Sequence, residues 1–142
     1  MSTVYTFRVS FSGRVIVYVG GDLAPDEDGW KAYVSAVRAH VQRHDDVVWL
    51  VWSGSSRPSS GQRQALLDVT PKNAPASVII ESVVARGVVT AFSWFMNAIS
   101  PFPPDKIEAA YDHLRLTPEE RRTVTQLTSR MQGELMGART GT

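Results

Sequence analysis

Residues 47–52 read Val-Val-Trp-Leu-Val-Trp, and this run decides the fold that the sequence predicts. Six consecutive apolar residues, rich in β-formers, are typical of a strand that is buried on both faces, as strands of parallel sheets are. Before the run, Trp30, Val34, Val37 and Val41 recur at the spacing of one helix face. The run therefore predicts a buried parallel strand with a helix ahead of it.

Two stretches rich in β-formers precede that helix. Residues 4–11 alternate weakly, and residues 14–19 read Arg-Val-Ile-Val-Tyr-Val. Ser12-Gly13 between them is a turn signal, and Gly20-Gly21 ends the second stretch. Together they predict an N-terminal antiparallel hairpin.

Strands and helices continue to alternate after the run. The pattern predicts a helix over 62–69, a strand over 77–81, a helix from Val84 to Ile99, a short edge strand over 99–102, a helix over 105–114, and a last helix from the capping box at Thr117 to about Leu135. Such alternation predicts an α/β domain: a mostly parallel sheet of four to five strands with an N-terminal antiparallel hairpin, helices packed on it and an additional C-terminal helix.

The composition limits the number of domains and the kinds of partner that the chain can have. The 142 residues suit one domain, and 43% of them are hydrophobic, as in globular proteins. A net charge of +1 supplies no broad field for nucleic acid, and the absence of cysteine excludes disulfides and thiol catalysis. We find no secretory signal and no run near the ~20 apolar residues that span a bilayer, so we expect a cytoplasmic protein.

The element order resembles the STAS fold of anti-sigma factor antagonists, in a small stand-alone bacterial branch. The resemblance is carried by residues 47–63 and by residues 86–95 (Arg-Gly-Val-Val-Thr-Ala-Phe-Ser-Trp-Phe) with Phe-Pro-Pro-Asp at 102–105. It implies a STAS-like α/β domain over residues 1–116. Residues 117–136 then form a helix that lies either on the domain or at an interface, and residues 137–142 form a disordered tail.

In that family an Asp-Ser-Ser-Gly motif opens the helix after the central strand, and its first serine is phosphorylated. The matching residues here are Pro58, Ser59, Ser60 and Gly61, so proline replaces the aspartate. The resemblance implies a non-enzymatic protein-interaction module in bacterial regulation or signalling, switched by phosphorylation of Ser59 or Ser60. Its partner would be a protein, such as a kinase or another regulator, or a second copy of the chain.

The serines also have a purely structural interpretation. Ser59 and Gln62 have the spacing of a capping box, which would make Ser59 an N-cap. In the switch interpretation, the free N–H groups and the dipole at the helix N-terminus would stabilise a phosphate there. The sequence leaves both interpretations open.

Three arginines form a candidate anion site. Arg57 follows the central strand, Arg63 lies in the first turn of the next helix, and Arg86 opens the helix after the fourth strand. Ligands of open α/β sheets gather at the carboxyl ends of the strands, so these side chains either converge on one anion or are separately solvated. This site supports an alternative function, the binding of a small anionic or lipid-like ligand in that crevice.

Two features are candidate partner surfaces. Trp94 lies off the apolar stripe of its helix, where an exposed aromatic ring would suit an interface. Val124, Leu127, Met131 and Leu135 form a narrow seam on the last helix. That seam either packs on its own domain or mediates dimerisation or partner capture.

The histidines support neither a metal site nor catalysis. His40 and His44 have a metal-compatible spacing, but Val41 stands where the zinc protease pattern requires glutamate. The three histidines show no recognisable nucleophile and base arrangement. We therefore expect no metal, no cofactor and no catalytic residue.

Overall fold

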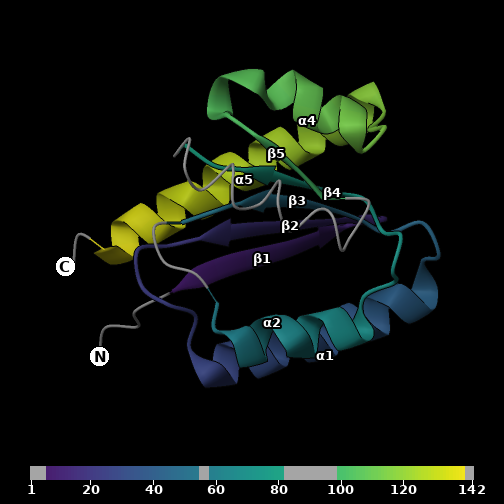
Figure 1. Ribbon diagram of the computed structural model, residues 1–142. Helices are drawn as coiled ribbons and strands as arrows, with labels where there is room; N and C mark the ends of the chain where they lie inside the picture. Colours follow the sequence, from purple (N-terminus) through teal and green to yellow (C-terminus); the bar gives the residue numbers. More distant parts are fainter. Residues whose placement is uncertain (1–5, 55–57, 82–98, 140–142) are drawn as a thin grey trace.

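The apolar run at residues 47–52 forms the middle of a five-stranded sheet (Figure 1). The computed structural model describes residues 6–54, 58–81 and 99–139. Strand β3 (Val48–Trp52) alternates its side chains between two apolar layers. Val48 and Leu50 face one core, and Trp49 faces the other. A strand buried on both faces explains why the run is continuously apolar.

The N-terminal hairpin consists of β1 (Phe7–Ser12) and β2 (Val15–Gly20). The strands pair antiparallel, with Phe7 opposite Gly20 and Ser12 opposite Val15. The turn between them contains Gly13 at φ 55°, a conformation that glycine adopts without steric cost. The hairpin therefore forms where Ser12-Gly13 predicts it.

The other strands extend the sheet in chain order, β1-β2-β3-β4-β5. Strands β4 (Ala76–Ile79) and β5 (Ile99–Phe102) follow β3, and every pair from β2 to β5 is parallel. The predicted α/β class, the N-terminal antiparallel hairpin and the mostly parallel sheet are confirmed.

Helices α1 (Glu27–Arg43) and α2 (Ser60–Val69) cover one face of the sheet (Figure 1). An aromatic cluster fills the layer between this face and α1, with ring centroids 5.2–6.2 Å apart; it consists of Phe7, Tyr18, Trp30 and Tyr33. The Trp49 indole donates to the Tyr33 hydroxyl (3.1 Å), so a buried polar pair is satisfied.

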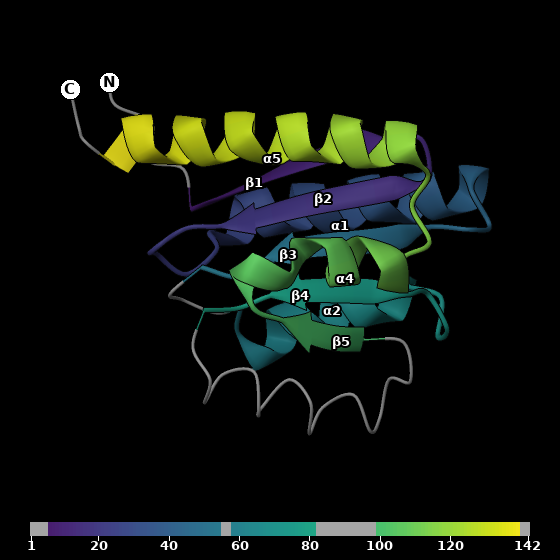
Figure 2. The ribbon, with the colours of Figure 1, turned by 90° about the horizontal axis from the view of Figure 1, so that it is seen from above.

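Helices α4 (Ile107–His113) and α5 (Pro118–Arg139) cover the other face, after a short 3-10 turn, η1 (Pro104–Lys106). Figure 2 shows α5 running along β1 and β2, beside α4, which packs on β4 and β5. The capping box at the start of α5 is confirmed: Thr117 Oγ1 accepts from the Glu120 N–H, and Glu120 Oε1 accepts from the Thr117 N–H.

At most of their ends, the described helices and strands begin or end a few residues away from the predicted positions. The largest difference is at the C-terminus, where α5 continues to Arg139 and so includes part of the predicted tail. Gly137 lowers helix propensity by about 1 kcal/mol relative to alanine, which alone does not end a helix. Of the helix predicted from Val84, only Ile99 is described, and it begins β5. None of the described helices is long and apolar enough to cross a membrane.

Candidate functional site

The predicted switch residues lie at the N-terminus of α2. The Oγ of Ser59 accepts a hydrogen bond from the Gln62 backbone N–H (3.1 Å), and the Oε1 of Gln62 accepts one from the Ser59 N–H (2.9 Å). This is the capping box that the spacing predicts. Ser59 and Ser60 are both exposed, and Ser60 is the first residue of the helix. The cap therefore uses Ser59 without shielding either serine from solvent.

Gln62 fixes this helix start to the rest of the domain. Its side chain is only 5% exposed, and its Nε2 donates to the Pro25 carbonyl (2.9 Å) and to the Glu27 carboxylate (3.1 Å). The Trp30 indole in turn donates to the Gln62 carbonyl (2.8 Å). From the sequence, Gln62 is predicted only as part of a cap, because these partners are 32 to 37 residues away along the chain.

The strand ends beside α2 meet through glycines. A Cβ added to Gly20 would lie 2.8 Å from the Gly54 nitrogen, and a Cβ added to Gly54 would overlap the Gly21 carbonyl oxygen. The chain that leaves β3 therefore crosses the chain that leaves β2 at direct backbone contact. Only glycine permits such an approach, so this crossing fixes where the loop toward Ser59 begins.

The structure places one of the three arginines of the predicted anion site. Arg63 lies in the first turn of α2, is exposed, and donates from Nη1 to the Pro58 carbonyl (3.0 Å). Arg57 and Arg86 lie outside the described residues. Convergence of the three on one anion stays a prediction.

The predicted partner surface on α5 packs against the sheet of its own chain. Val124 and Met131 are buried in the core, and Leu127 and Leu135 are half-buried. These contacts correspond to the alternative in which the last helix packs on its own domain, and they leave Val124 and Met131 inaccessible to a partner. Trp94, the other predicted interface residue, lies outside the described residues.

His40 and His44 stack at the end of α1, with ring centroids 4.5 Å apart, and Phe11 covers His40 at 4.9 Å. Burial lowers the pKa of His40, and the nearby His44 lowers it further. Within the part of the chain that the structure describes, no three His, Asp or Glu side chains lie close enough to hold a metal ion. The rings of Phe11, His40 and His44 pack against one another near the tip of the hairpin.

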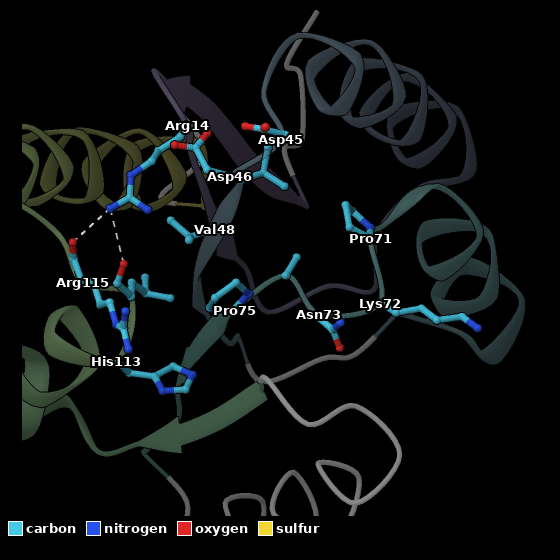
Figure 3. Close-up of a pocket in the computed structure, with 13 residues that line it drawn as sticks. Arg14, Asp45, Asp46, Val48, Pro71, Lys72, Asn73, Pro75, His113 and Arg115 are labelled. Atoms are coloured by element: carbon cyan, nitrogen blue, oxygen red, sulfur yellow. Dashed lines mark hydrogen bonds between the residues drawn. The ribbon is translucent and has the colours of Figure 1, made fainter.

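An open cavity of about 680 Å³ lies at the opposite edge of the sheet, at the amino ends of β2, β3 and β4 (Figure 3). Residues from three connections and from the end of α4 line it. They include Arg14, Asp45, Asp46, Val48, Pro71, Lys72, Asn73, Pro75, His113 and Arg115. The sequence gives no signal for this cavity, because no local pattern shows that these turns meet.

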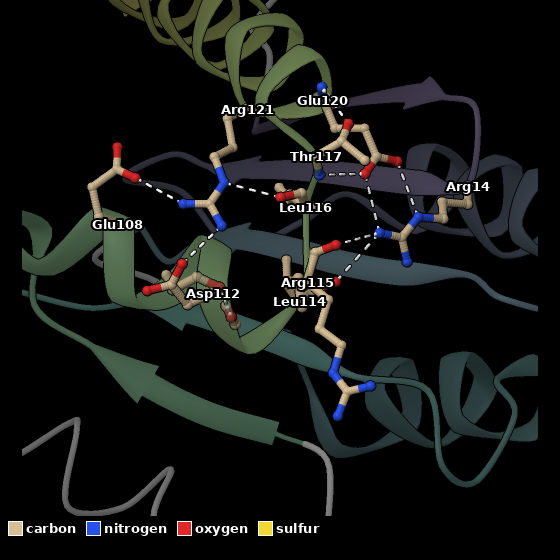
Figure 4. Close-up of polar contacts among 11 residues, drawn as sticks. Arg14, Glu108, Asp112, Leu114, Arg115, Leu116, Thr117, Glu120 and Arg121 are labelled. Carbon is tan, nitrogen blue, oxygen red and sulfur yellow. Dashed lines mark hydrogen bonds and ion pairs between the residues drawn. The ribbon is translucent and has the colours of Figure 1, made fainter.

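Arg14 lines this cavity and also binds the start of α5 (Figure 4). Its guanidinium binds the Glu120 carboxylate through Nε (3.0 Å) and Nη2 (3.1 Å), and Nη2 also donates to the carbonyls of Arg115 (3.0 Å) and Leu114 (3.4 Å). These hydrogen bonds hold the pKa of Glu120 below its usual value and raise that of Arg14. The hairpin turn, the end of α4 and the start of α5 are therefore tied together.

A second arginine ties α4 to α5. Arg121 donates to Asp112 (2.7 Å), Glu108 (2.9 Å) and the Leu116 carbonyl (3.0 Å), and its guanidinium lies 5.9 Å from the centre of the Tyr111 ring (Figure 4). All these partners belong to α4 or to the turn after it, whereas Arg121 belongs to α5. We interpret this network as structural.

A scan of protein-family models, a search of curated proteins and a search of solved structures each found no match for this chain.

Proposed function

We propose that the protein is a non-enzymatic interaction module of STAS type in bacterial regulation, and that its partner binds the segment from Pro58 to Gly61 at the start of α2. One observation carries the proposal: Ser59 and Ser60 are exposed on a helix start that the buried Gln62 holds in place. Exposed groups on a rigid frame are where binding residues concentrate.

Phosphorylation of either serine would change this surface strongly. A kinase would transfer the terminal phosphoryl group of a nucleoside triphosphate to the serine oxygen, releasing the hydroxyl proton and the nucleoside diphosphate. The product carries about −1.5 to −2 charges beside the helix N–H groups and Arg63. That charge would reorganise the contacts of a docked partner, so modification would switch binding.

The experiment uses four matched baits in affinity capture from the native cell, read by mass spectrometry. Ser59→Asp adds a charge and keeps an N-cap, because aspartate is itself a preferred capping residue. Ser59→Ala removes the cap without adding a charge, and Ser60→Asp adds a charge beside an intact cap. We expect the wild type and Ser59→Ala to retain a common partner that both aspartate variants release.

The control is Ser129→Asp, which adds the same charge on an exposed face of α5. It should capture the partner as the wild type does. Release by Ser129→Asp would show a general charge effect, and equal capture by all the baits would leave Ser59 as a helix cap only.

Small-ligand binding is the second candidate function, and the cavity at the amino ends of the strands favours it. Its volume of about 680 Å³ lies within the range of ligand pockets. Arg63, the described arginine of the predicted anion site, lies in the first turn of α2 and does not line this cavity.

A further inference from the structure

The cavity at the amino ends of the strands presents charges of opposite sign on opposite sides. Figure 3 shows Asp45 and Asp46 on one side of Val48 and Pro75, and Arg115 and His113 on the other. Val48 and Pro75 supply an apolar floor between the two charged sides. A ligand that spans this floor would meet carboxylates at one end and the Arg115 guanidinium at the other.

The acidic side is reinforced by helix termini. Asp45 and Asp46 follow the end of α1 and are exposed, and the connection after α2 lines the same cavity through Pro71 to Pro75. The carboxyl ends of both helices therefore point to this edge, and a helix carboxyl end carries partial negative charge. This side of the cavity favours a cationic group.

The basic side contains an arginine in an unusual conformation. Arg115 has φ 54°, and its N–H donates to the Asp112 carbonyl (3.0 Å), while the next N–H, of Leu116, donates to the Tyr111 carbonyl (3.2 Å). These bonds form a Schellman motif, whose left-handed position is usually glycine because any Cβ is strained there. Strained residues of this kind concentrate at functional sites, and here the strained residue places a guanidinium on the cavity wall.

Arg14 does not add to the charge that a ligand would meet. Its guanidinium is neutralised by Glu120 and engaged by two carbonyls at the end of α4. Asp46 also interacts electrostatically with Arg14, which leaves Asp45 on one side and Arg115 on the other. The exposed Lys72 lies in the connection after α2, away from Arg115 (Figure 3). The cavity therefore presents both signs of charge, with Asp45 and Arg115 on opposite sides of the apolar floor.

We propose that this cavity binds a small zwitterion of the amino-acid or short-peptide class. The ammonium group lies toward Asp45 and Asp46, the carboxylate lies toward Arg115, and the chain between them lies on Val48 and Pro75. The site is at the opposite edge of the sheet from Ser59, so it does not depend on the proposed partner surface.

The test uses triglycine, with N-acetyltriglycine and triglycinamide as analogues that each keep one charge. Amide shifts of the full-length protein are followed by NMR at neutral pH. We expect triglycine to bind with a Kd on the order of 1 mM, as suits a ligand of this size. Each analogue should bind about two- to fivefold more weakly, the usual effect of one exposed ion pair. The shifts should centre on Val48, Ala74 and Leu114.

Variants assign the two ends of the ligand. Arg115→Gly should weaken the binding of triglycine and of N-acetyltriglycine about two- to fivefold and leave the binding of triglycinamide unchanged. It should also raise Tm, because glycine relieves the strain. Asp45→Asn should weaken the binding of triglycine and of triglycinamide and leave the binding of N-acetyltriglycine unchanged. Lys31→Gln, an exposed charge change on α1, is the control and should alter none of these affinities.

Opposite effects of Arg115→Gly on stability and on affinity are the signature of a residue kept for binding. Equal binding of the three probes, shifts that centre elsewhere, or unchanged triglycine affinity in Arg115→Gly would each overturn the proposal. If Arg115→Gly fails to fold, Asp45→Asn with triglycinamide decides the question alone.

Discussion

At the scale of single residues, the buried side chain of Gln62 connects the start of α2 to the start of α1. One side chain completes the Ser59 cap and binds the Pro25 carbonyl and the Glu27 carboxylate. A buried polar group of this kind is costly to leave half-satisfied. The position of the proposed partner surface therefore depends on a glutamine that faces the interior.

Gln62→Ala should lower the free energy of unfolding by about 1–3 kcal/mol, because it leaves the Ser59 N–H and the Pro25 carbonyl without their partner. The measurement is urea unfolding followed by circular dichroism. Gln64→Ala is the matched control, since Gln64 is exposed and bonds only to Asp68 on the same helix. It should change stability by less than about 0.5 kcal/mol. Equal losses in the two variants would refute the central role of Gln62.

At the scale of elements, the Arg14–Glu120 contact joins the hairpin turn to the first turn of α5. Hydrogen bonds from Arg14 and then from Thr117 hold the pKa of Glu120 below its usual value of 4.5. A carboxyl group whose pKa is lower in the folded state stabilises the fold when it is ionised. Its contribution is complete above the unfolded-state pKa and is lost as the pH falls through the folded-state pKa.

We therefore expect the wild type to lose part of its stability below about pH 4.5. Glu120→Gln should be less stable than the wild type at pH 7, and the difference should narrow as the pH falls. Glutamine also completes a capping box, so the variant isolates the charge. Thermal unfolding between pH 3 and pH 7 measures both proteins, with Glu119→Gln as the control in the same turn. A difference that does not change with pH would exclude Glu120 as the source.

The elements that the sequence predicts well are those whose signal is local. The continuous run at 47–52 predicts a doubly buried strand, and the capping boxes at Ser59 and Thr117 predict where α2 and α5 begin. The partners of Gln62 and the cavity escape prediction because they join turns that are distant in sequence. The left-handed conformation of Arg115 also escapes prediction, because such a conformation is predicted from glycine and residue 115 is arginine.

At the scale of the whole molecule, the two proposed sites lie at opposite edges of the sheet, and helices cover its two faces. The carboxyl-end edge presents Ser59 and Ser60, and the amino-end edge contains the cavity around Arg115. The helices between the edges bury both faces, as a mostly parallel sheet requires. Helix α5 is part of this covering, which is one of the two alternatives that the sequence leaves open for residues 117–136.

The last prediction follows from that covering. Val124 is fully buried and Met131 is 2% exposed, both against the core that contains Val15, Val17 and Leu50. Burying two such side chains contributes roughly 3–6 kcal/mol, and the newly exposed sheet would add to the loss. This loss is comparable to the free energy of unfolding of a typical domain, about 5–15 kcal/mol.

A chain ending at Leu116 should therefore lack cooperative thermal unfolding by circular dichroism. A chain ending at Met136 retains the buried residues and should unfold as the full-length protein does. Cooperative unfolding of the shorter chain would show that residues 1–116 fold on their own and that α5 is an addition to the domain.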